Sequence, residues 1–228
     1  MDETVQLMEK FNGDLVKCRK CPRLVEFRET VLSGIRKYEG QEFWRKPVPG
    51  YGDINGMILI VGLAPAASGG NRTGRVFTGD KSSDFLVSSL YEVGLASRPE
   101  SVRKDDGLVY YNTYITAPVK CVPPDNVPLP QEVRNCAPYF HFELKNMKNL
   151  KTVLALGQFA FKAVLNYYSS EGINIRGLKF KNGEYVTSGD VKIFCAFHPS
   201  PRNVNTGKLS RESFIKTLRK VKDSTGMA

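Results

Sequence analysis

The sequence lacks a hydrophobic run long enough to cross a membrane. Its longest apolar stretch, residues 57–67, contains glycine and proline and falls well short of the roughly 20 residues that a bilayer requires. The first 20 residues are amphipathic and charged, unlike a secretory signal peptide. Internal repeats and low-complexity tracts are also missing. We therefore expect a single soluble, cytoplasmic domain over residues 1–228, with no membrane partner.

Acidic residues are scarce relative to basic ones. The chain has 33 lysine and arginine residues against 23 aspartate and glutamate residues, which gives a formal net charge of +10. Such an excess favours a polyanionic partner such as nucleic acid. A generally basic surface without a specific partner is the alternative. Hydrophobic residues make up 41% of the chain, enough for a core without disulfides.

Apolar runs alternate with helical patterns along the chain, which predicts an α/β fold with a parallel sheet covered on both faces. The first residues form an amphipathic helix in this interpretation, and residues 171–190 form a hairpin or an extended loop. The predicted strands are residues 57–62, 108–115, 152–157 and 191–197. The further predicted helices are residues 23–39, 80–94, 131–147, 158–170 and 210–222.

A glycine-rich loop over residues 62–80 follows the first predicted strand. Residues 69–74 match the first half of a phosphate-binding P-loop. However, Arg75 and Val76 stand where a lysine and a hydroxyl residue are required, which disfavours a nucleotide triphosphatase. Arg72 and Arg75 remain candidate phosphate contacts.

The same loop contains an aromatic ring and a carboxylate. Phe77 lies among polar residues and glycines, where it can stack on a flat ligand such as a base or anchor the loop. Asp80 precedes a predicted helix and can cap it. A cap uses only one carboxylate oxygen, so the other stays available for chemistry.

Histidine is rare, and one of the two histidines follows the fourth predicted strand. His198 precedes Pro199–Pro201, which predicts a rigid turn without helix. Loops at the carboxyl ends of parallel strands line the ligand crevice, so this loop and residues 62–80 should meet. His141 lies in a predicted helix and is assigned a structural role. Residues 202–222 form either a solvated basic face or a surface that grips a duplex.

Five cysteines without a secretory signal argue against a disulfide framework. Cys18 and Cys21 have the spacing of a metal or cluster chelate. Cys121 and Cys136 can complete a four-thiolate site if their segment folds back on the N-terminal helix. The spacing leaves zinc, an iron–sulfur centre and unligated core thiols open. Cys195 sits in an apolar strand and is predicted to be a buried core thiol.

Four motifs are specific when they are taken together. They are Gly62-Leu63-Ala64-Pro65-Ala66, Gly70–Arg75 ahead of Phe77-Thr78-Gly79-Asp80, Lys120–Asn126 and His198–Arg202. These motifs resemble those of the family 5 uracil-DNA glycosylases, many of which come from thermophiles. The resemblance runs from about Cys18 to the final helix. The cysteine arrangement is similar to the [4Fe–4S] ligation of the family 4 and family 5 enzymes.

The resemblance implies a three-layer α/β/α sandwich around a four-stranded parallel sheet. It also implies hydrolysis of the N-glycosidic bond of uracil in DNA, which leaves an abasic site. Family 5 members often accept deaminated purines as well, so hypoxanthine and xanthine are further candidate substrates. Asp80 would orient the attacking water, His198 would stabilise the departing base, and Asn126 would contact the water or the base.

The remaining candidate residues fall into three groups. The implied base-binding residues are Gly62, Ala64 and Phe77. The predicted DNA-binding residues are Arg72, Arg75, Arg202, Lys208 and Arg211. The implied ligands of a [4Fe–4S] cluster are Cys18, Cys21, Cys121 and Cys136.

Two departures from related patterns concern the pocket. Leu63 follows the first glycine of the first motif, which removes an obvious water-activating side chain. Ala117 stands where family 4 enzymes place an asparagine that reads uracil, so a tolerant pocket is expected.

The expected partner is DNA containing deaminated bases, bound by a nucleoid-associated monomer. A replication clamp has no supporting motif. The alternative function is a non-catalytic iron–sulfur or zinc module that binds DNA.

Overall fold

A mixed six-stranded sheet forms the centre of the structure, a computed structural model that describes residues 2–226. The strands follow the order β1-β3-β2-β4-β6-β5. The inner strands β3, β2, β4 and β6 run parallel, whereas β1 and β5 pair antiparallel at the two edges. The strand bounds are β1 (Tyr51–Gly52), β2 (Ile58–Val61), β3 (Thr113–Thr116), β4 (Thr152–Leu156), β5 (Tyr185–Ser188) and β6 (Val191–Ala196).

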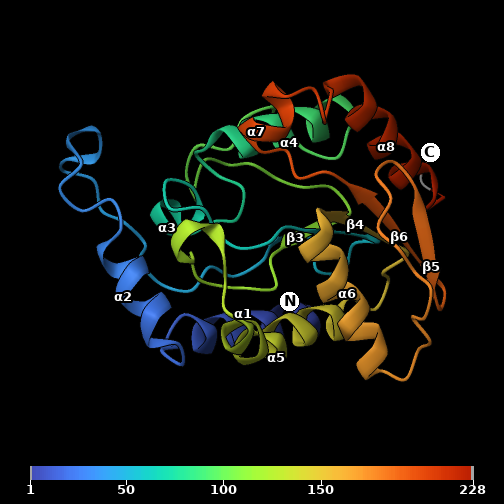
Figure 1. Ribbon diagram of the computed structural model, residues 1–228, viewed down its shortest axis with the longest axis horizontal. Coiled ribbons are helices and arrows are strands. Elements are labelled where there is room, and N and C mark those ends of the chain that lie inside the picture. Colours follow the sequence, from blue (N-terminus) through green and yellow to red (C-terminus); the bar gives the residue numbers. More distant parts are fainter. Residues whose placement is uncertain (1, 227–228) are drawn as a thin grey trace.

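Helices cover both faces of the sheet and give the chain three layers (Figure 1). The α-helices are α1 (Glu3–Leu15), α2 (Pro22–Thr30), α3 (Gly70–Thr73), α4 (Lys81–Glu92), α5 (Pro130–Asn146), α6 (Gln158–Ser170), α7 (Pro201–Asn205) and α8 (Arg211–Asp223). Two 3-10 helices are η1 (Arg36–Tyr38) and η2 (Pro124–Asn126). No helix among residues 2–226 combines the length and the apolar character needed to cross a membrane. The predicted sandwich is confirmed, and its four parallel strands are the inner part of a larger sheet.

Side-chain alternation along β2 divides the core into two halves. Ile58 and Ile60 pack in the half that α4 and α8 cover. Leu59 and Val61 pack in the half that α1, α5 and α6 cover. All four side chains are fully buried, as an apolar strand inside a parallel sheet requires.

The second helix is shorter than the predicted span of residues 23–39. Helix α2 ends at Thr30, and the chain then takes left-handed conformations at Leu32 and Gly34, with φ of 65° and 75°. A left-handed residue interrupts the helical hydrogen-bond ladder. The rest of the predicted helix is a turn followed by η1, and this segment leaves the body of the molecule (Figure 1).

The strand predicted over residues 108–115 is displaced toward the C-terminus. Strand β3 starts at Thr113, opposite Ile58 of β2. Asn112 has a φ of 51° and breaks the extended backbone just before it. The preceding residues instead pair with the segment after α4, where the Tyr111 amide donates to the Leu95 carbonyl at 3.0 Å.

The proline-bearing turn after β6 contains a helix, which corrects the prediction of a helix-free turn. Helix α7 starts at Pro201, a position where proline is favoured because its missing N–H has no intrahelical partner anyway. The Ser200 hydroxyl caps this helix by accepting from the Asn203 amide at 3.4 Å. The turn is therefore both rigid and helical.

A buried ion pair fixes the chain after β3. Lys120 Nζ lies 2.6 Å from both Glu143 Oε2 and Thr116 Oγ1, and both charged side chains are excluded from solvent. Removing one partner of such a pair leaves an uncompensated buried charge. The sequence alone does not predict this ion pair, because Lys120 and Glu143 are 23 residues apart and belong to different elements.

Candidate active site

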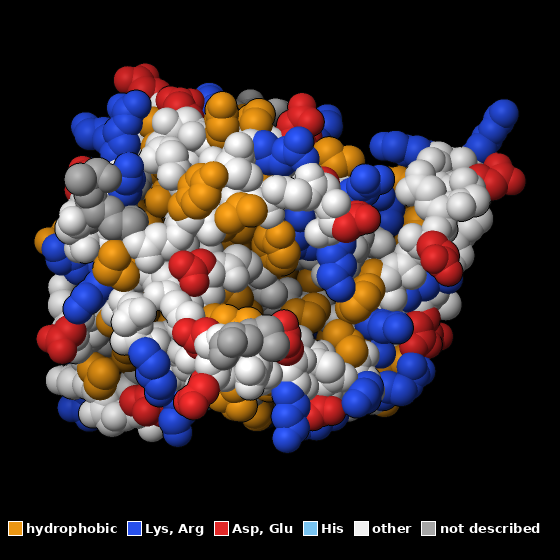
Figure 2. All heavy atoms as spheres, turned by 180° about the vertical axis from the view of Figure 1, so that it is seen from behind, with side chains coloured by type: hydrophobic (Ala, Val, Ile, Leu, Met, Phe, Trp, Pro, Cys, Tyr) orange, Lys and Arg blue, Asp and Glu red, His pale blue; other side chains and the backbone are white. Residues whose placement is uncertain are grey.

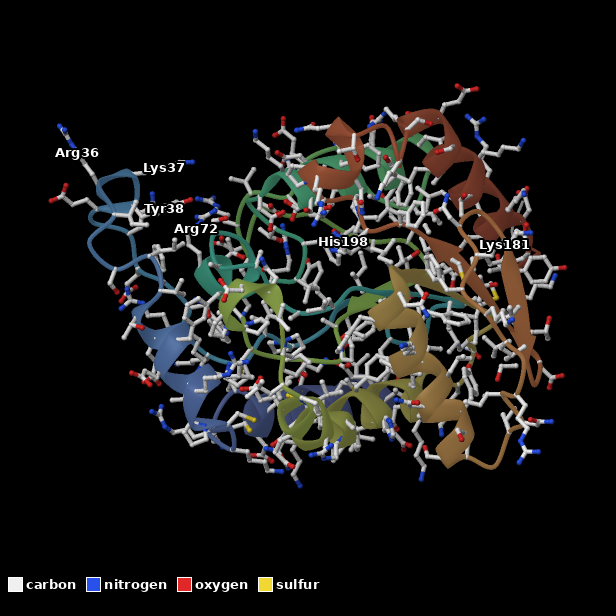
Figure 3. The ribbon with its side chains drawn as sticks, viewed as in Figure 1. Arg36, Lys37, Tyr38, Arg72, Lys181 and His198 are labelled. Atoms are coloured by element: carbon white, nitrogen blue, oxygen red, sulfur yellow. The ribbon has the colours of Figure 1, made fainter. Side chains whose placement is uncertain are left out.

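One pocket gathers the predicted catalytic residues at the carboxyl ends of β2 and β6. Its volume is about 470 Å³. Its walls are Leu63, Ala64, Pro65, Ala66, Ser68, Phe77, Asp80, Lys81, Ser82, Asn126, His198, Ser200 and Pro201. The prediction that the two loops meet in one cavity is confirmed. Figure 3 shows His198 in the middle of the molecule, next to this loop region.

Asp80 caps a helix and also lines the pocket. Its Oδ1 accepts hydrogen bonds from the amides of Ser82 and Ser83, both at 2.9 Å, and so caps α4. Among the described residues none donates to Oδ2, which lies against Gly69, where an added Cβ would stand 2.0 Å away. Burial raises the pKa of the Asp80 carboxyl, although the two amide hydrogen bonds oppose this. The predicted cap therefore leaves one carboxylate oxygen uncommitted.

Phe77 and His198 stack against each other in the pocket. Their ring centroids are 5.9 Å apart and their planes differ by 29°. Phe77 has a left-handed φ of 47°, so the loop holds the ring at a conformational cost. A Cβ at Gly62 would lie 3.0 Å from this ring. The Gly62 amide donates to the Thr116 carbonyl at 2.9 Å, so it is engaged in the sheet. Contact of Gly62 and Ala64 with a base stays a prediction.

His198 is held by its backbone, and its imidazole faces the pocket. Its carbonyl accepts from the Ser200 amide and from Asn203 Nδ2, both at 2.8 Å. Burial lowers the pKa of His198 to about 4, so the ring is neutral at pH 7 and carries one N–H donor. The second histidine, His141, lies in α5 with its ring edge-on to Tyr167 at 5.3 Å.

Asn126 reaches the pocket from η2. The residue is exposed, has a φ of 58°, and follows Asp125, whose φ is 54°. Asparagine and aspartate adopt this left-handed conformation more readily than other side chains. Lys81, Ser82 and Ser200 also line the pocket and were not predicted. Their signal in the sequence is position alone: Lys81 and Ser82 follow Asp80, and Ser200 lies between Pro199 and Pro201.

Arg75 is not available to DNA, which corrects its predicted role. The residue is 1% exposed, and its guanidinium lies 2.6 Å from the Asp106 carboxylate. It also donates to the hydroxyls of Thr78 and Ser101. A buried guanidinium with these partners stabilises the loop instead of a phosphate.

Arg72 is also engaged inside the protein. Its Nε donates to the Ser68 carbonyl at 2.8 Å, and Nη2 donates to the Gly79 carbonyl at 3.4 Å. These contacts brace the loop that carries Asp80. A direct contact between Arg72 and DNA stays a prediction.

The other predicted DNA contacts belong to the C-terminal elements. Arg202 and Lys208 are exposed on α7 and just after it. Arg211 is about half-exposed, and its guanidinium pairs with Glu92 at 3.0 Å. Their contacts with DNA stay predictions.

The four predicted cysteine ligands line one small cavity of about 10 Å³. Cys18 lies in the loop after α1, and Cys21 lies at the start of α2. Cys121 lies in the segment after β3, and Cys136 lies in helix α5. Within the described part of the chain, no three histidine, cysteine or acidic side chains converge as a binding group for a metal ion. Cys195 is buried in β6, as predicted.

Polar side chains donate hydrogen bonds toward two of these sulfurs. Arg28 Nη1 lies 3.1 Å from Cys121 Sγ, and Asn135 Nδ2 lies 3.3 Å from Cys21 Sγ. Arg28 is 2% exposed, and its Nε has no hydrogen-bond partner. The nearest carboxylate, that of Glu29, is 3.9 Å from the Arg28 guanidinium. A buried positive charge therefore faces the cysteines.

Comparisons with known proteins agree on one family. A sequence model described as the uracil DNA glycosylase superfamily matches residues 49–222. A type-5 uracil-DNA glycosylase of Pyrobaculum aerophilum is 44% identical over 96% of this chain and 93% of that protein. One from Thermus thermophilus is 42% identical over 96% and 99%, respectively. A type-4 uracil-DNA glycosylase of Archaeoglobus fulgidus is 31% identical over 67% of this chain and 70% of its own length.

Proposed function

The chain belongs to the uracil-DNA glycosylase superfamily, and from this premise we propose that it hydrolyses the N-glycosidic bond of uracil in DNA and leaves an abasic site. The observation that carries the proposal is the pocket in which Asp80, His198 and Phe77 lie together. We propose that it acts as a monomer on DNA that contains deaminated bases.

Uracil enters the pocket after it is extruded from the duplex, because its glycosidic bond cannot be reached inside the base stack. Phe77 offers an aromatic face for the extruded base. A base between Phe77 and His198 would need two stacking distances, about 7 Å in total. The ring centroids are 5.9 Å apart, so the base stacks on the other face of Phe77.

Bond cleavage separates a sugar cation from a base anion. The C1′–N bond breaks, and its electron pair leaves with the base, while positive charge develops on the sugar. The neutral imidazole of His198 donates its N–H to the carbonyl oxygen on which negative charge accumulates. Asp80 Oδ2 orients the water that adds to C1′ and stabilises the cation. The proton lost by this water passes to solvent or to Asp80, and the base anion takes up a proton after release.

The pocket favours tolerance toward deaminated bases. Ala117 is 3% exposed and offers no side-chain amide to read uracil. Asn126 is an exposed pocket-lining amide that can adjust to different base edges. Hypoxanthine and xanthine, like uracil, carry at least one ring carbonyl on which the negative charge of the departing base can spread. We therefore include both purines among the proposed substrates.

We propose that the four cysteines hold a [4Fe–4S] cluster. They line one cavity, and hydrogen-bond donors approach the sulfurs, as is common at iron–sulfur sites. The buried Arg28 guanidinium has only a long ion pair with Glu29, at 3.9 Å, and would gain a closer counter-charge from thiolates and a cluster in the cavity. The cluster would supply a structural cross-link between α2, the segment after β3 and α5. No step of base removal uses it.

Arg28 also connects the cysteine region to the glycine-rich loop over residues 62–80, called the catalytic loop from here on because it carries Asp80. Its carbonyl oxygen accepts a hydrogen bond from Asn71 Nδ2 at 3.1 Å. Asn71 is fully buried in α3, within the loop that ends at Asp80. A cluster that fixes α2 therefore also steadies the loop that forms the pocket.

The test is base release from duplexes that contain uracil, hypoxanthine or xanthine at one position. Abasic sites are revealed as strand breaks after alkali. We expect breaks with the uracil duplex, and Asp80→Asn and His198→Ala should each slow their formation at least tenfold, in line with the roughly 10²–10³ effect of one oxyanion donor. DNA binding without any abasic sites would instead support the non-catalytic DNA-binding module.

A further inference from the structure

Residues 31–46 form an arm that projects from the body of the protein (Figures 1 and 3). The arm leaves the end of α2, turns through η1 and returns along the catalytic loop. Figure 3 shows Arg36 and Lys37 at its outer end, and Figure 2 shows basic and acidic side chains on the projection. Neither the pocket nor the cysteine site uses its outer end.

Internal contacts give the arm a defined shape. The rings of Tyr38 and Phe43 meet edge-on with centroids 5.6 Å apart. The Arg45 guanidinium lies 5.3 Å from the Phe43 ring centroid and donates to the Ser33 hydroxyl at 3.1 Å. These contacts join the outgoing and returning halves of the arm. It can therefore present its outer side chains in a fixed geometry.

The base of the arm is bonded to the loop that carries Asp80. The amides of Trp44 and Arg45 donate to the carbonyls of Arg72 and Asn71, both at 3.0 Å. These two acceptors lie in α3, within the glycine-rich loop. The arm and the catalytic loop are therefore joined by main-chain hydrogen bonds.

The Arg72 side chain adds a second connection. Its guanidinium lies 5.7 Å from the Tyr38 ring centroid and 3.5 Å from Gln41 Oε1, both in the arm. The same group donates to the Ser68 and Gly79 carbonyls in the catalytic loop. The Arg72 contacts therefore fix the position of the arm relative to the pocket.

The outer cations of the arm are available to a ligand. Arg36 and Lys37 are exposed, and no ion pair is formed by either within residues 2–226. Other arginines of this protein, such as Arg23 and Arg75, are already paired with carboxylates. The arm also contains two glutamates, so it offers a few point contacts and not a broad basic face.

We propose that this arm binds backbone phosphates of the duplex outside the extruded nucleotide, with Arg36 and Lys37 as the contacting side chains. This inference rests on the proposed glycosylase function. DNA is favoured over a protein partner because the enzyme must hold the duplex while one nucleotide is out of the stack. Phosphate contacts set the register of a protein on DNA without reading sequence, which suits an arm mounted on the catalytic loop.

The test compares two charge-matched variants of the full-length protein. R36Q/K37Q removes the two outer cations of the arm. R176Q/K179Q removes two exposed cations from the loop that leads to Lys181, which Figure 3 labels at the opposite end of the molecule. Lys181 itself is kept because it pairs with Glu184. Binding to a long uracil-containing duplex is measured as a function of salt concentration, and unfolding is followed by circular dichroism to verify that both variants fold.

We expect R36Q/K37Q to bind the long duplex roughly tenfold more weakly at low salt and to lower the slope of log K against log salt by about 2, one per lost phosphate contact. The control should keep the wild-type slope. On a duplex too short to reach the arm, single-turnover uracil release should be equal in R36Q/K37Q and wild type.

The outcomes separate this inference from the function on which it rests. If the wild-type protein releases uracil but R36Q/K37Q retains its affinity and salt slope, the arm does not bind DNA and the inference is wrong. Equal losses in both variants would also overturn it, because they would reflect net charge alone. Absence of uracil release by the wild-type protein would instead refute the glycosylase function.

Discussion

The ring of Phe77 lies 5.9 Å from the imidazole of His198, with the two planes 29° apart. The two residues come from loops after β2 and β6, strands that β4 separates in the sheet. Their contact closes one side of the pocket and leaves no room for a base between the rings. Phe77 therefore presents one face to a ligand, and His198 is left to act through its ring nitrogens.

Phe77→Leu should weaken the binding of uracil-containing DNA. Leucine keeps apolar bulk but removes the aromatic face, and base–aromatic stacking contributes about 1–3 kcal/mol. The measurement is the Kd for a duplex with a non-hydrolysable uracil nucleotide. Phe85→Leu is the matched control, because Phe85 packs against Phe214 of α8, 5.4 Å away. An unchanged Kd in Phe77→Leu would assign Phe77 to anchoring the loop alone.

Asp80→Asn should slow uracil release at least tenfold while leaving the protein nearly as stable as wild type. Asparagine caps helices as well as aspartate does, so the hydrogen bonds from Ser82 and Ser83 can persist while the charge is lost. Single-turnover rates and the thermal midpoint Tm separate the two effects. A variant with a wild-type rate would remove Asp80 from the chemistry.

Asp80→Ala should lose both activity and stability, since alanine cannot cap α4. Loss of a cap typically costs about 1 kcal/mol of unfolding free energy. Ser210→Ala is the comparison, because the Ser210 hydroxyl caps α8 by accepting from the Ser213 amide at 3.1 Å. This variant should lower Tm with little change in rate. A large loss of activity in Ser210→Ala would mean that rates in this protein follow stability alone.

His198 should make the protein less stable as the pH falls from about 6.5 toward 4. Its pKa is about 4 in the folded protein and near 6.5 when unfolded, so the unfolded chain binds more protons in this window. Asp80 acts in the opposite sense above pH 3.8, because its folded pKa is raised. His198→Gln should therefore show a flatter dependence of Tm on pH than wild type.

Proton NMR tests the same assignment directly, because the chain has only two histidines. Burial also lowers the pKa of His141, but that ring is less enclosed, and His141→Gln assigns the two signals. The His198 signal should remain that of neutral imidazole down to about pH 5. Titration of His198 near 6.5 would contradict the lowered pKa of this half-buried ring and allow a charged imidazolium at the leaving base.

Much of the fold is readable from local patterns, whereas the edges depend on tertiary pairing. The strand at Ile58–Val61 is predictable because it is an apolar run of strand length, and the strand at Val191–Ala196 because Lys192 alone interrupts its apolar run. The short edge strand at Tyr51–Gly52 lacks such a run and forms because Tyr51 pairs with Ile115. The pocket is predictable because chain topology brings the carboxyl ends of parallel strands to one edge.

Burial of individual charges could not be predicted in the same way. Arg75 looks like a phosphate contact in a glycine-rich loop, but Asp106, 31 residues later, folds over it. The arm was also missed, since the helical pattern of residues 23–39 continues past Leu32, where the backbone turns left-handed. In both cases long-range contacts or single-residue conformations override the local pattern.

The cysteine cavity leads to the last prediction, loss of a cluster in C18S/C21S. The purified wild-type protein should be brown and contain iron and acid-labile sulfide in equal amounts. C18S/C21S should lose both and melt at a lower temperature, because α2 loses its cross-link to Cys121 and Cys136. Cys195→Ala is the control, since Cys195 is buried in β6 away from the cavity. A colourless wild-type protein with zinc and full activity would replace the cluster by a zinc site.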